Sequence, residues 1–175
     1  MSEAETHVAV AQARARAHAG IPGADRAITL AAIRAALAEV LDPELPVLSV
    51  VDLGIVHRVE LDADGIGVTI LPTFVGCPAL DVIRTSIAER LGAFGLPVRV
   101  GTTFEVPWTS DRISPAGRRA LATAGIAPPS EPDAVRCPFC ASGQVVMDSA
   151  FGPTQCRSLY YCRACRQPFE ALKAV

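Results

Sequence analysis

The sequence predicts an α+β fold: a small mixed sheet with helices on one face, followed by a small module built around paired cysteines. Three observations support this prediction. Apolar residues recur at helical spacing in two segments, β-branched stretches flank a hairpin turn between them, and two CxxC motifs lie near the end of the chain. The order helix, two strands, helix, strand, helix is typical of helices packed on a short sheet.

The first half of the chain supplies one helix and a hairpin. Residues 1–26 are rich in Ala and polar residues and are expected to form a flexible N-terminal extension. A helix is predicted from Thr29 to Leu41 with Thr29 as its N-cap, and Pro43 ends it because proline disfavours helical geometry at the preceding residue. Strands are predicted for residues 55–61 and 66–71, joined by a turn at 62–65.

The second half adds a helix after Cys77, a third strand at residues 97–106 and a short helix at 114–125, with Ser114 as cap and Gly125 as stop. Residues 126–136 are rich in proline and are predicted to be a linker. One domain would then span residues 27–125 and the cysteine module residues 137–173. The predicted core of the domain consists of Leu30, Ile33, Leu37, Val56, Val68, Ile70, Ile83, Ile87 and Val100.

Cys77 is the residue on which the predicted chemistry centres. Pro78 suits the first position of the following helix, whose apolar residues recur at steps of three and four. Cys77 would then be the N-cap, where unpaired amide groups and the helix dipole favour the thiolate and make the sulfur a better nucleophile or metal ligand. The alternative is a small apolar residue that fills a turn, because free cysteines are often buried and inert.

The charge of the chain does not indicate a nucleic-acid partner. The formal net charge is -2, and residues 136–175 hold 5 of the 16 Lys and Arg residues and 2 of the 18 Asp and Glu residues. Thiolates around a Zn²⁺ ion would cancel most of this basic excess, so binding by a basic stripe is not supported. No secretory signal and no apolar run long enough to span a bilayer is visible, and a soluble cytoplasmic protein is expected.

The motifs CPFC at 137–140 and CRAC at 162–165 form a second cysteine group. Their spacing is close to that of zinc ribbons, in which two CxxC pairs complete a tetrahedral site. In a reducing compartment such pairs are more typical of metal ligands than of disulfides. We therefore predict a structural Zn²⁺ held by Cys137, Cys140, Cys162 and Cys165. It would supply folding free energy of roughly 10–16 kcal/mol.

Cys156 lies close to the second pair in sequence. It could be a plain core residue, an additional or replacement ligand, or part of an iron–sulfur site, because ligand softness alone does not separate Zn²⁺ from an iron–sulfur cluster among thiolates. The sequence leaves these alternatives open. A thioredoxin-like role is disfavoured, because neither CxxC follows a βαβ-like pattern.

Four longer stretches carry a resemblance to a known family. They are DPELPVLSVVDLGIV (42–56), TFVGCPA (73–79), VPWTSDRISPAGRRAL (106–121) and CPFC with FGPTQCRSLYYCRACRQPF (137–169). Together they resemble the PaaD family, also called PaaJ: accessory subunits encoded with the phenylacetyl-CoA oxygenase (epoxidase) of aerobic phenylacetate breakdown. The resemblance covers residues 28–173. The first two stretches alone would indicate only the broader iron–sulfur cluster assembly domain family, which includes SufT-like proteins.

The resemblance implies an assembly domain followed by a zinc-ribbon-like segment, and a non-catalytic role in making or maintaining a metal centre. The implied partners are phenylacetyl-CoA oxygenase components, with the iron–sulfur reductase as one client. Cys77, Asp52 and Thr73 would take part in transfer of a cluster or of iron, and the cargo would be a transient iron–sulfur cluster or iron. Residue spacing leaves a homodimer open.

Two other functions stay open from the sequence: a structural adaptor subunit of the oxygenase complex, and an iron–sulfur electron-transfer subunit. Asp52 could equally make a local loop hydrogen bond. Asp42 and Glu44 are expected to be a solvated turn rather than an acid/base pair. No catalytic triad, P-loop or dinucleotide-binding fingerprint appears, so an independent hydrolase, ATPase or Rossmann enzyme is not expected.

Overall fold

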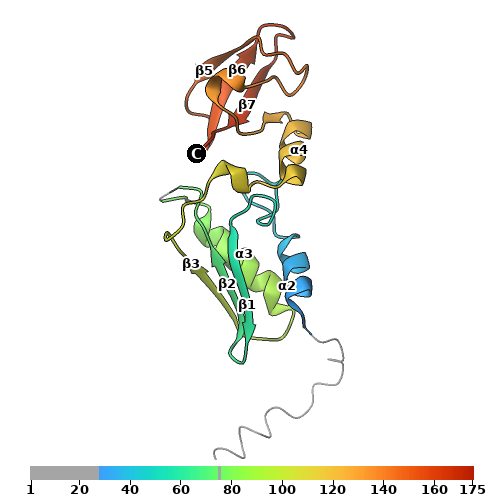
Figure 1. The fold of residues 1–175 in the computed structure, drawn as a ribbon, viewed down its shortest axis with the longest axis vertical. Coiled ribbons are helices and arrows are strands. Elements are labelled where there is room, and N and C mark those ends of the chain that lie inside the picture. The colour runs from blue at the N-terminus through green and yellow to red at the C-terminus, as the bar shows by residue number, and fades with distance from the viewer. Residues whose placement is uncertain (1–27, 75) are drawn as a thin grey trace, which may run out of the picture.

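The computed structural model describes residues 28–74 and 76–175. The predicted N-terminal extension, residues 1–26, lies outside these residues. The chain has the predicted α+β fold, with two small sheets towards opposite ends of an elongated molecule and helix α4 between them (Figure 1). Within the described residues, no helix combines the length and the apolar character that a membrane crossing requires.

Helix α2, Leu30–Leu37, begins where the sequence predicts. The Thr29 hydroxyl accepts a hydrogen bond from the Ala32 backbone N–H at 3.1 Å, which caps the first turn. The helix ends before the predicted Leu41. Leu41 instead forms an antiparallel bridge with Ser49, so pairing between distant residues overrides the helical pattern there.

The first sheet has the strand order β1-β2-β3. β1, Val56–Asp62, and β2, Gly65–Ile70, form the predicted antiparallel hairpin. α3, Leu80–Gly92, then crosses over to β3, Val98–Thr102, which pairs in parallel with β2. The helices α2 and α3 pack on one face of this sheet (Figure 1), which confirms the mixed sheet with one covered face.

One hydrophobic core joins these helices to the sheet. Most of the predicted core residues are buried, whereas Val56 and Val100 are partly buried. The prediction for Leu30 is wrong: as the first residue of α2 it is 41% exposed at the end of the helix. The fully buried side chains that the prediction missed are Leu48, Val50, Ile55, Ile66, Leu71, Leu91 and Leu121.

Helix α4, Pro115–Thr123, leads from the first sheet towards the second. Its predicted cap is confirmed, because the Ser114 hydroxyl accepts a hydrogen bond from the Gly117 N–H at 2.9 Å. Gly125 follows the helix with a φ of 79°, a left-handed conformation that favours glycine. Short 3-10 helices cover Ser110–Arg112 and Pro132–Ala134.

The second sheet has the strand order β4-β7-β6-β5, and we call this sheet with its loops the C-terminal module. Its strands are β4 (Ile126–Ala127), β5 (Val145–Ser149), β6 (Arg157–Cys162) and β7 (Pro168–Leu172). β4 lies inside the segment predicted as a linker and pairs in parallel with β7.

The C-terminal module packs on one end of the first core. Leu172 of β7 is buried in the hydrophobic cluster of the N-terminal part, and Cys156, just before β6, packs against the same cluster. The Arg157 guanidinium donates a hydrogen bond to the backbone carbonyl of Glu44 at 3.3 Å. The loop before β6 therefore lies next to the loop that follows α2, and it shares a hollow with Phe74 and Pro78 of the loop that follows β2.

Candidate functional site

Cys77 lies in a turn and does not cap α3. The helix begins at Leu80, and its N-cap is Ala79. The Cys77 N–H donates a hydrogen bond to the Phe74 carbonyl, and the Cys77 carbonyl accepts one from the Leu80 N–H, both at 3.3 Å. The predicted capping role of Cys77 is therefore wrong, because this turn delays the start of the helix.

The side chain of Cys77 lines a cavity of about 280 Å³, which we call the Cys77 cavity. Cys77 is half-buried and packs against the core, so the wall around its sulfur is partly apolar. Residues of the C-terminal module complete the cavity. The lining groups that carry metal-binding or charged atoms are Asp42, Glu44, Cys77, Cys156 and Lys173.

The Cys77 thiol is less acidic than the sequence predicts. Burial raises its pKa above the ordinary value and the negative charge of Glu44 raises it further, whereas the Ala79 N–H and the Thr73 side chain lower it. The net shift is upward, so the expected preference for the thiolate is wrong: a single backbone amide reaches the sulfur and does not offset burial. Cys77 at neutral pH is a thiol that loses its proton when a metal or an electrophile binds.

Asp42 and Glu44 occupy one turn but have different surroundings. Asp42 is 6% exposed, and its carboxylate accepts hydrogen bonds from the backbone N–H groups of Glu44 and Leu45, each at 2.8 Å. The turn is as predicted, but Asp42 is buried and not solvated. Because Asp42 is committed to the backbone, it fixes the loop that carries Glu44 to the cavity.

Of the three predicted transfer residues, the structure brings Thr73 and Cys77 together in the cavity, and places Asp52 outside its lining. The Asp52 carboxylate accepts hydrogen bonds from the hydroxyls of Ser49 and Ser114. The Ser114 N–H also donates to the Asp52 carbonyl at 2.9 Å. Asp52 therefore ties the loop before β1 to the start of α4.

The four predicted metal ligands form a compact group. Two sulfur–sulfur distances, Cys137 to Cys165 and Cys140 to Cys162, are 3.6 Å, and all four sulfurs lie within 4.8 Å of one another. Zn–S bonds of about 2.3 Å place tetrahedral sulfurs about 3.8 Å apart, so the group fits a single tetrahedral ion. A cluster attaches its cysteines to several iron atoms and needs wider spacing.

Both CxxC motifs fold in the same way. The Ala141 N–H donates to the Cys137 carbonyl, and the Arg166 N–H donates to the Cys162 carbonyl, each at 2.8 Å. Ala141 and Arg166 adopt φ values of 59° and 62°, a conformation uncommon for residues with a side chain. Two turns of matching geometry thus present the four sulfurs. Cys156 is not part of this group.

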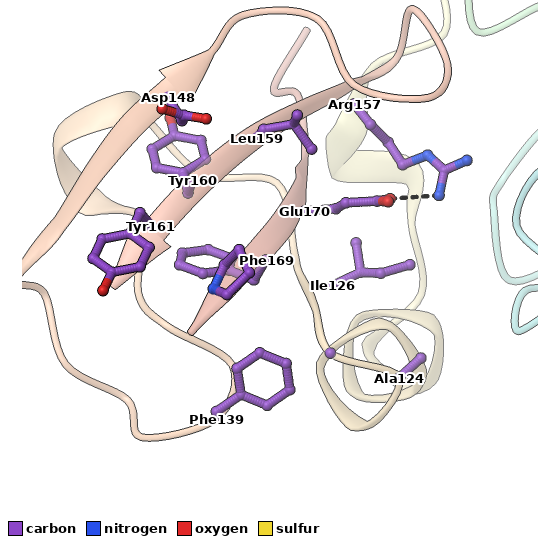
Figure 2. Close-up of a pocket in the computed structure, with 12 residues that line it drawn as sticks. Ala124, Ile126, Phe139, Asp148, Arg157, Leu159, Tyr160, Tyr161, Phe169 and Glu170 are labelled. Carbon is purple, nitrogen blue, oxygen red and sulfur yellow. Dashed lines mark hydrogen bonds and ion pairs between the residues drawn. The ribbon is translucent and has the colours of Figure 1, made fainter. Parts of the chain in front are cut away.

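The C-terminal module also carries an open hollow of about 580 Å³ beside its aromatic residues (Figure 2). Tyr160 and Phe169 stack with ring centroids 5.6 Å apart and are buried. At another part of the hollow, Arg157 pairs with Glu170 at 2.6 Å (Figure 2). The aromatic residues Phe139, Phe151 and Tyr161 are exposed, so the small core of the module rests on two aromatic rings together with the cysteines.

Cys156 does not lie with the four ribbon cysteines; of the alternatives that the sequence leaves open, its packing against the first hydrophobic cluster favours a core residue over a ribbon ligand. The sequence puts it near the second CxxC pair, but its side chain lines the Cys77 cavity. Burial raises its pKa, and so does the charge of Glu44. No sequence signal could have found this position, because it depends on how the two parts pack together.

Two protein families match separate parts of the chain. An iron–sulfur cluster assembly protein family matches residues 30–101, and a PaaD zinc beta ribbon domain matches residues 123–173. Two solved structures are similar to about half of the chain. A domain of unknown function, DUF59, from Bacillus anthracis is 29% identical with a TM-score of 0.48, covering 51% of this chain and 87% of that one. A conserved hypothetical protein from Thermotoga maritima is 32% identical with a TM-score of 0.47, covering 54% and 94%.

Two relatives are similar in sequence. The Fe-S protein maturation auxiliary factor YitW of Bacillus subtilis (strain 168) is 36% identical over 94 residues, covering 51% of this chain and 89% of that protein. A "Putative 1,2-phenylacetyl-CoA epoxidase" component of Escherichia coli (strain K12) is 38% identical over 151 residues, covering 82% of this chain and 92% of that protein. The chain therefore belongs to the PaaD family of phenylacetyl-CoA epoxidase components, with an iron–sulfur cluster assembly domain followed by a zinc ribbon.

Proposed function

We propose that this chain is a non-catalytic accessory factor of the phenylacetyl-CoA oxygenase system in aerobic phenylacetate catabolism. It supports the maturation of an iron–sulfur or other metal centre in a client component. The observation that carries this proposal is the position of Cys77, a partly buried thiol in the wall of a cavity. A sulfur with cavity on one side can meet a visiting metal.

The relatives support both parts of the proposal. The E. coli relative is named as an epoxidase component, and the B. subtilis relative as a maturation factor for Fe-S proteins. The assembly-family match covers residues 30–101 and so includes Cys77 and Thr73.

Cys77 holds the cargo, iron or a cluster fragment, for a short time. Because its pKa is raised, the sulfur must give up a proton to bind a metal, and return of that proton favours release. The Thr73 side chain and the Ala79 N–H stabilise the thiolate while the metal is bound. Asp52 contributes by fixing the loop before β1. This balance suits a carrier better than a permanent site.

The four cysteines of the zinc ribbon have a different role. We propose that they hold a structural Zn²⁺, which stabilises the C-terminal module, and that this module recognises the client. The compact sulfur spacing supports a single ion over a cluster. The proposed partners are the oxygenase components, with the iron–sulfur reductase as the client. We place this activity in the cytoplasm, where thiols stay reduced.

The proposal is tested by producing the oxygenase components together with the wild-type chain, with Cys77→Ser, or with Glu131→Gln. Glu131 is an exposed carboxylate outside the lining of the Cys77 cavity and serves as the matched control. We expect Cys77→Ser to lower the iron and acid-labile sulfide of the purified client, and the oxygenase activity with them, whereas Glu131→Gln leaves all three unchanged. Equal client metal with Cys77→Ser and wild type would overturn the carrier role.

The same preparations separate the two other functions. Stable co-purification with the oxygenase and no effect on client metal would favour a structural adaptor. Anaerobic purification followed by metal analysis distinguishes the third function: a brown protein that contains iron and acid-labile sulfide in its ribbon would favour an electron-transfer subunit.

A further inference from the structure

We propose that Cys77 and Cys156 together form a two-thiolate binding site for a ferrous ion, shared between the assembly domain and the zinc ribbon. This inference rests on the proposed function, because it names how the cargo is held. In this site the zinc ribbon supplies one of the metal ligands in addition to recognising the client.

The first observation in support is the position of the two cysteines. Cys77 follows β2 in the assembly domain and Cys156 precedes β6 in the ribbon, yet both line the Cys77 cavity. Both side chains also pack at the edge of the same hydrophobic cluster. The wall of one cavity therefore includes a thiol from each side of the junction between the domains.

The second support is that Cys156 has no other metal to bind. The four cysteines of the ribbon form a complete tetrahedral set without it. Within the described residues, the Cys156 sulfur has one hydrogen-bond partner, the Thr154 hydroxyl at 3.1 Å. Cys156 lies outside the ribbon site and lines a cavity that Cys77 also lines. It is therefore placed to act as a ligand in that cavity.

The third support is the charge around the two sulfurs. The Glu44 carboxylate acts on both Cys77 and Cys156, and it lines the same cavity. Two thiolates are ligands that a ferrous ion accepts, and the negative charge of Glu44 near both sulfurs favours a cation there. Lys173 supplies a positive charge at the cavity wall, where its ammonium group donates to the Gln155 carbonyl at 2.7 Å.

The loops that carry these groups are tied to one another. Arg157 donates from Nε to the Thr154 hydroxyl at 3.0 Å and from its terminal nitrogen to the Glu44 carbonyl at 3.3 Å. The Lys173 N–H donates to the Cys156 carbonyl at 2.9 Å. Arg157 thus connects the loop of Cys156 to the loop of Glu44 and acts as a positioning residue.

Binding is an exchange of protons for metal without oxidation or reduction. One ferrous ion replaces the two thiol protons, two Fe–S bonds form, and both protons pass to solvent. Because burial raises the pKa of both thiols, acid releases the ion. A client that offers stronger ligands removes the ion, and the two thiols take up protons again.

Anaerobic titration with Co²⁺ tests the site, because sulfur-to-cobalt charge transfer reports how many thiolates bind the ion. The ribbon is first loaded with one equivalent of Zn²⁺, which it retains because zinc binds such ligands more tightly than cobalt. Wild type is expected to bind one further Co²⁺. The charge-transfer intensity per bound cobalt should fall by about half in Cys77→Ser and in Cys156→Ser, since each removes one of two thiolates. Glu131→Gln should match wild type, and Fe²⁺ should displace the cobalt only in large molar excess, because it binds such ligands more weakly than Co²⁺.

Wild-type intensity and affinity in Cys156→Ser would overturn the two-thiolate site. Phenylarsine oxide on the zinc-loaded wild type gives a second measurement that needs no variant. The arsenic oxide condenses with two thiols, forming two As–S bonds and releasing water, so mass spectrometry should find the peptides of Cys77 and Cys156 joined through one arsenic. Absence of that product would also contradict the proposal.

The client-maturation assay distinguishes failure of this shared site from failure of the proposed accessory function on which it rests. If Cys77→Ser impairs client metal content and Cys156→Ser does not, the accessory function stands and the shared site is wrong. If neither variant impairs it, the carrier function itself is wrong.

Discussion

Arg157 donates a hydrogen bond to the backbone carbonyl of Glu44 at 3.3 Å, while the same guanidinium pairs with the Glu170 carboxylate at 2.6 Å. One side chain thus joins the ribbon sheet to the loop that carries Glu44 to the Cys77 cavity. The Arg157 side chain is 13% exposed, so this ion pair is better shielded from water than a surface pair.

Replacement of Arg157 by Gln should weaken the junction between the two domains. The variant loses charge-assisted hydrogen bonds and leaves Glu170 without its partner, so we expect a loss of about 1–3 kcal/mol in the free energy of unfolding. Urea unfolding measures this loss, with Arg119→Gln as the control, because Arg119 is exposed. Equal stability of the two variants would show that the Arg157 contacts do not hold the junction.

Removal of the ribbon metal should unfold the C-terminal module before the assembly domain. The module buries only a small cluster around Tyr160, Phe169 and two cysteines, whereas the first core is much larger. We expect chelator treatment to expose the amides of β5–β7 to hydrogen exchange and to leave β1–β3 protected. Unchanged exchange in β5–β7 after complete removal of metal would contradict a structural role for the ion.

Alkylation of Cys77 should depend steeply on pH. Its raised pKa keeps it a thiol at neutral pH, and only the thiolate reacts, so below the pKa the rate should rise by about tenfold per pH unit. Glu44→Gln removes a negative charge that opposes ionisation, which lowers the pKa and should speed the reaction at pH 8. Mass spectrometry of zinc-loaded protein treated with iodoacetamide gives the rates, and Glu131→Gln is the control. A slower reaction in Glu44→Gln would contradict the prediction that the Glu44 charge raises the pKa of Cys77.

Two glycines separate the cost of backbone conformation from the cost of a clash. Gly54 and Gly76 have φ values of 73° and 83°, but a Cβ at Gly54 would overlap the backbone carbonyl of Arg112, whereas a Cβ at Gly76 meets nothing within 4 Å. We expect Gly76→Ala to cost about 1–2 kcal/mol in the free energy of unfolding, and Gly54→Ala clearly more. Similar losses of unfolding free energy for the two variants in urea would show that the added Cβ at Gly54 causes no costly overlap.

Much of the fold could be predicted because its signals are local. Thr29 and Ser114 were identifiable as helix caps from the residues that follow them, and the β1–β2 hairpin from its alternation and its turn. The grouping of the four ribbon cysteines could be predicted because two CxxC motifs at this spacing are typical of a tetrahedral metal site.

The candidate site was less predictable because it is assembled from distant segments. The pairing of Leu41 with Ser49 shortened α2 against its apolar period. The acidity expected of Cys77 required a helix that begins directly after it, but α3 begins at Leu80. Burial then raises the pKa of Cys77 more than the hydrogen bond from the Ala79 N–H lowers it. The position of Cys156 follows from docking of the ribbon on the first core, which residue spacing does not encode.

Transfer of labelled iron from the purified chain to a client tests the central claim most directly. Zinc-loaded wild type and Cys77→Ser are each incubated with isotopically labelled Fe²⁺ under anaerobic conditions, freed of excess iron, and mixed with the iron-free reductase component and a chelator that traps unbound iron. We predict that wild type delivers label to the reductase and that Cys77→Ser delivers no more than a sample without the chain. Equal delivery by both proteins would contradict the assignment of Cys77 as the metal-carrying thiol.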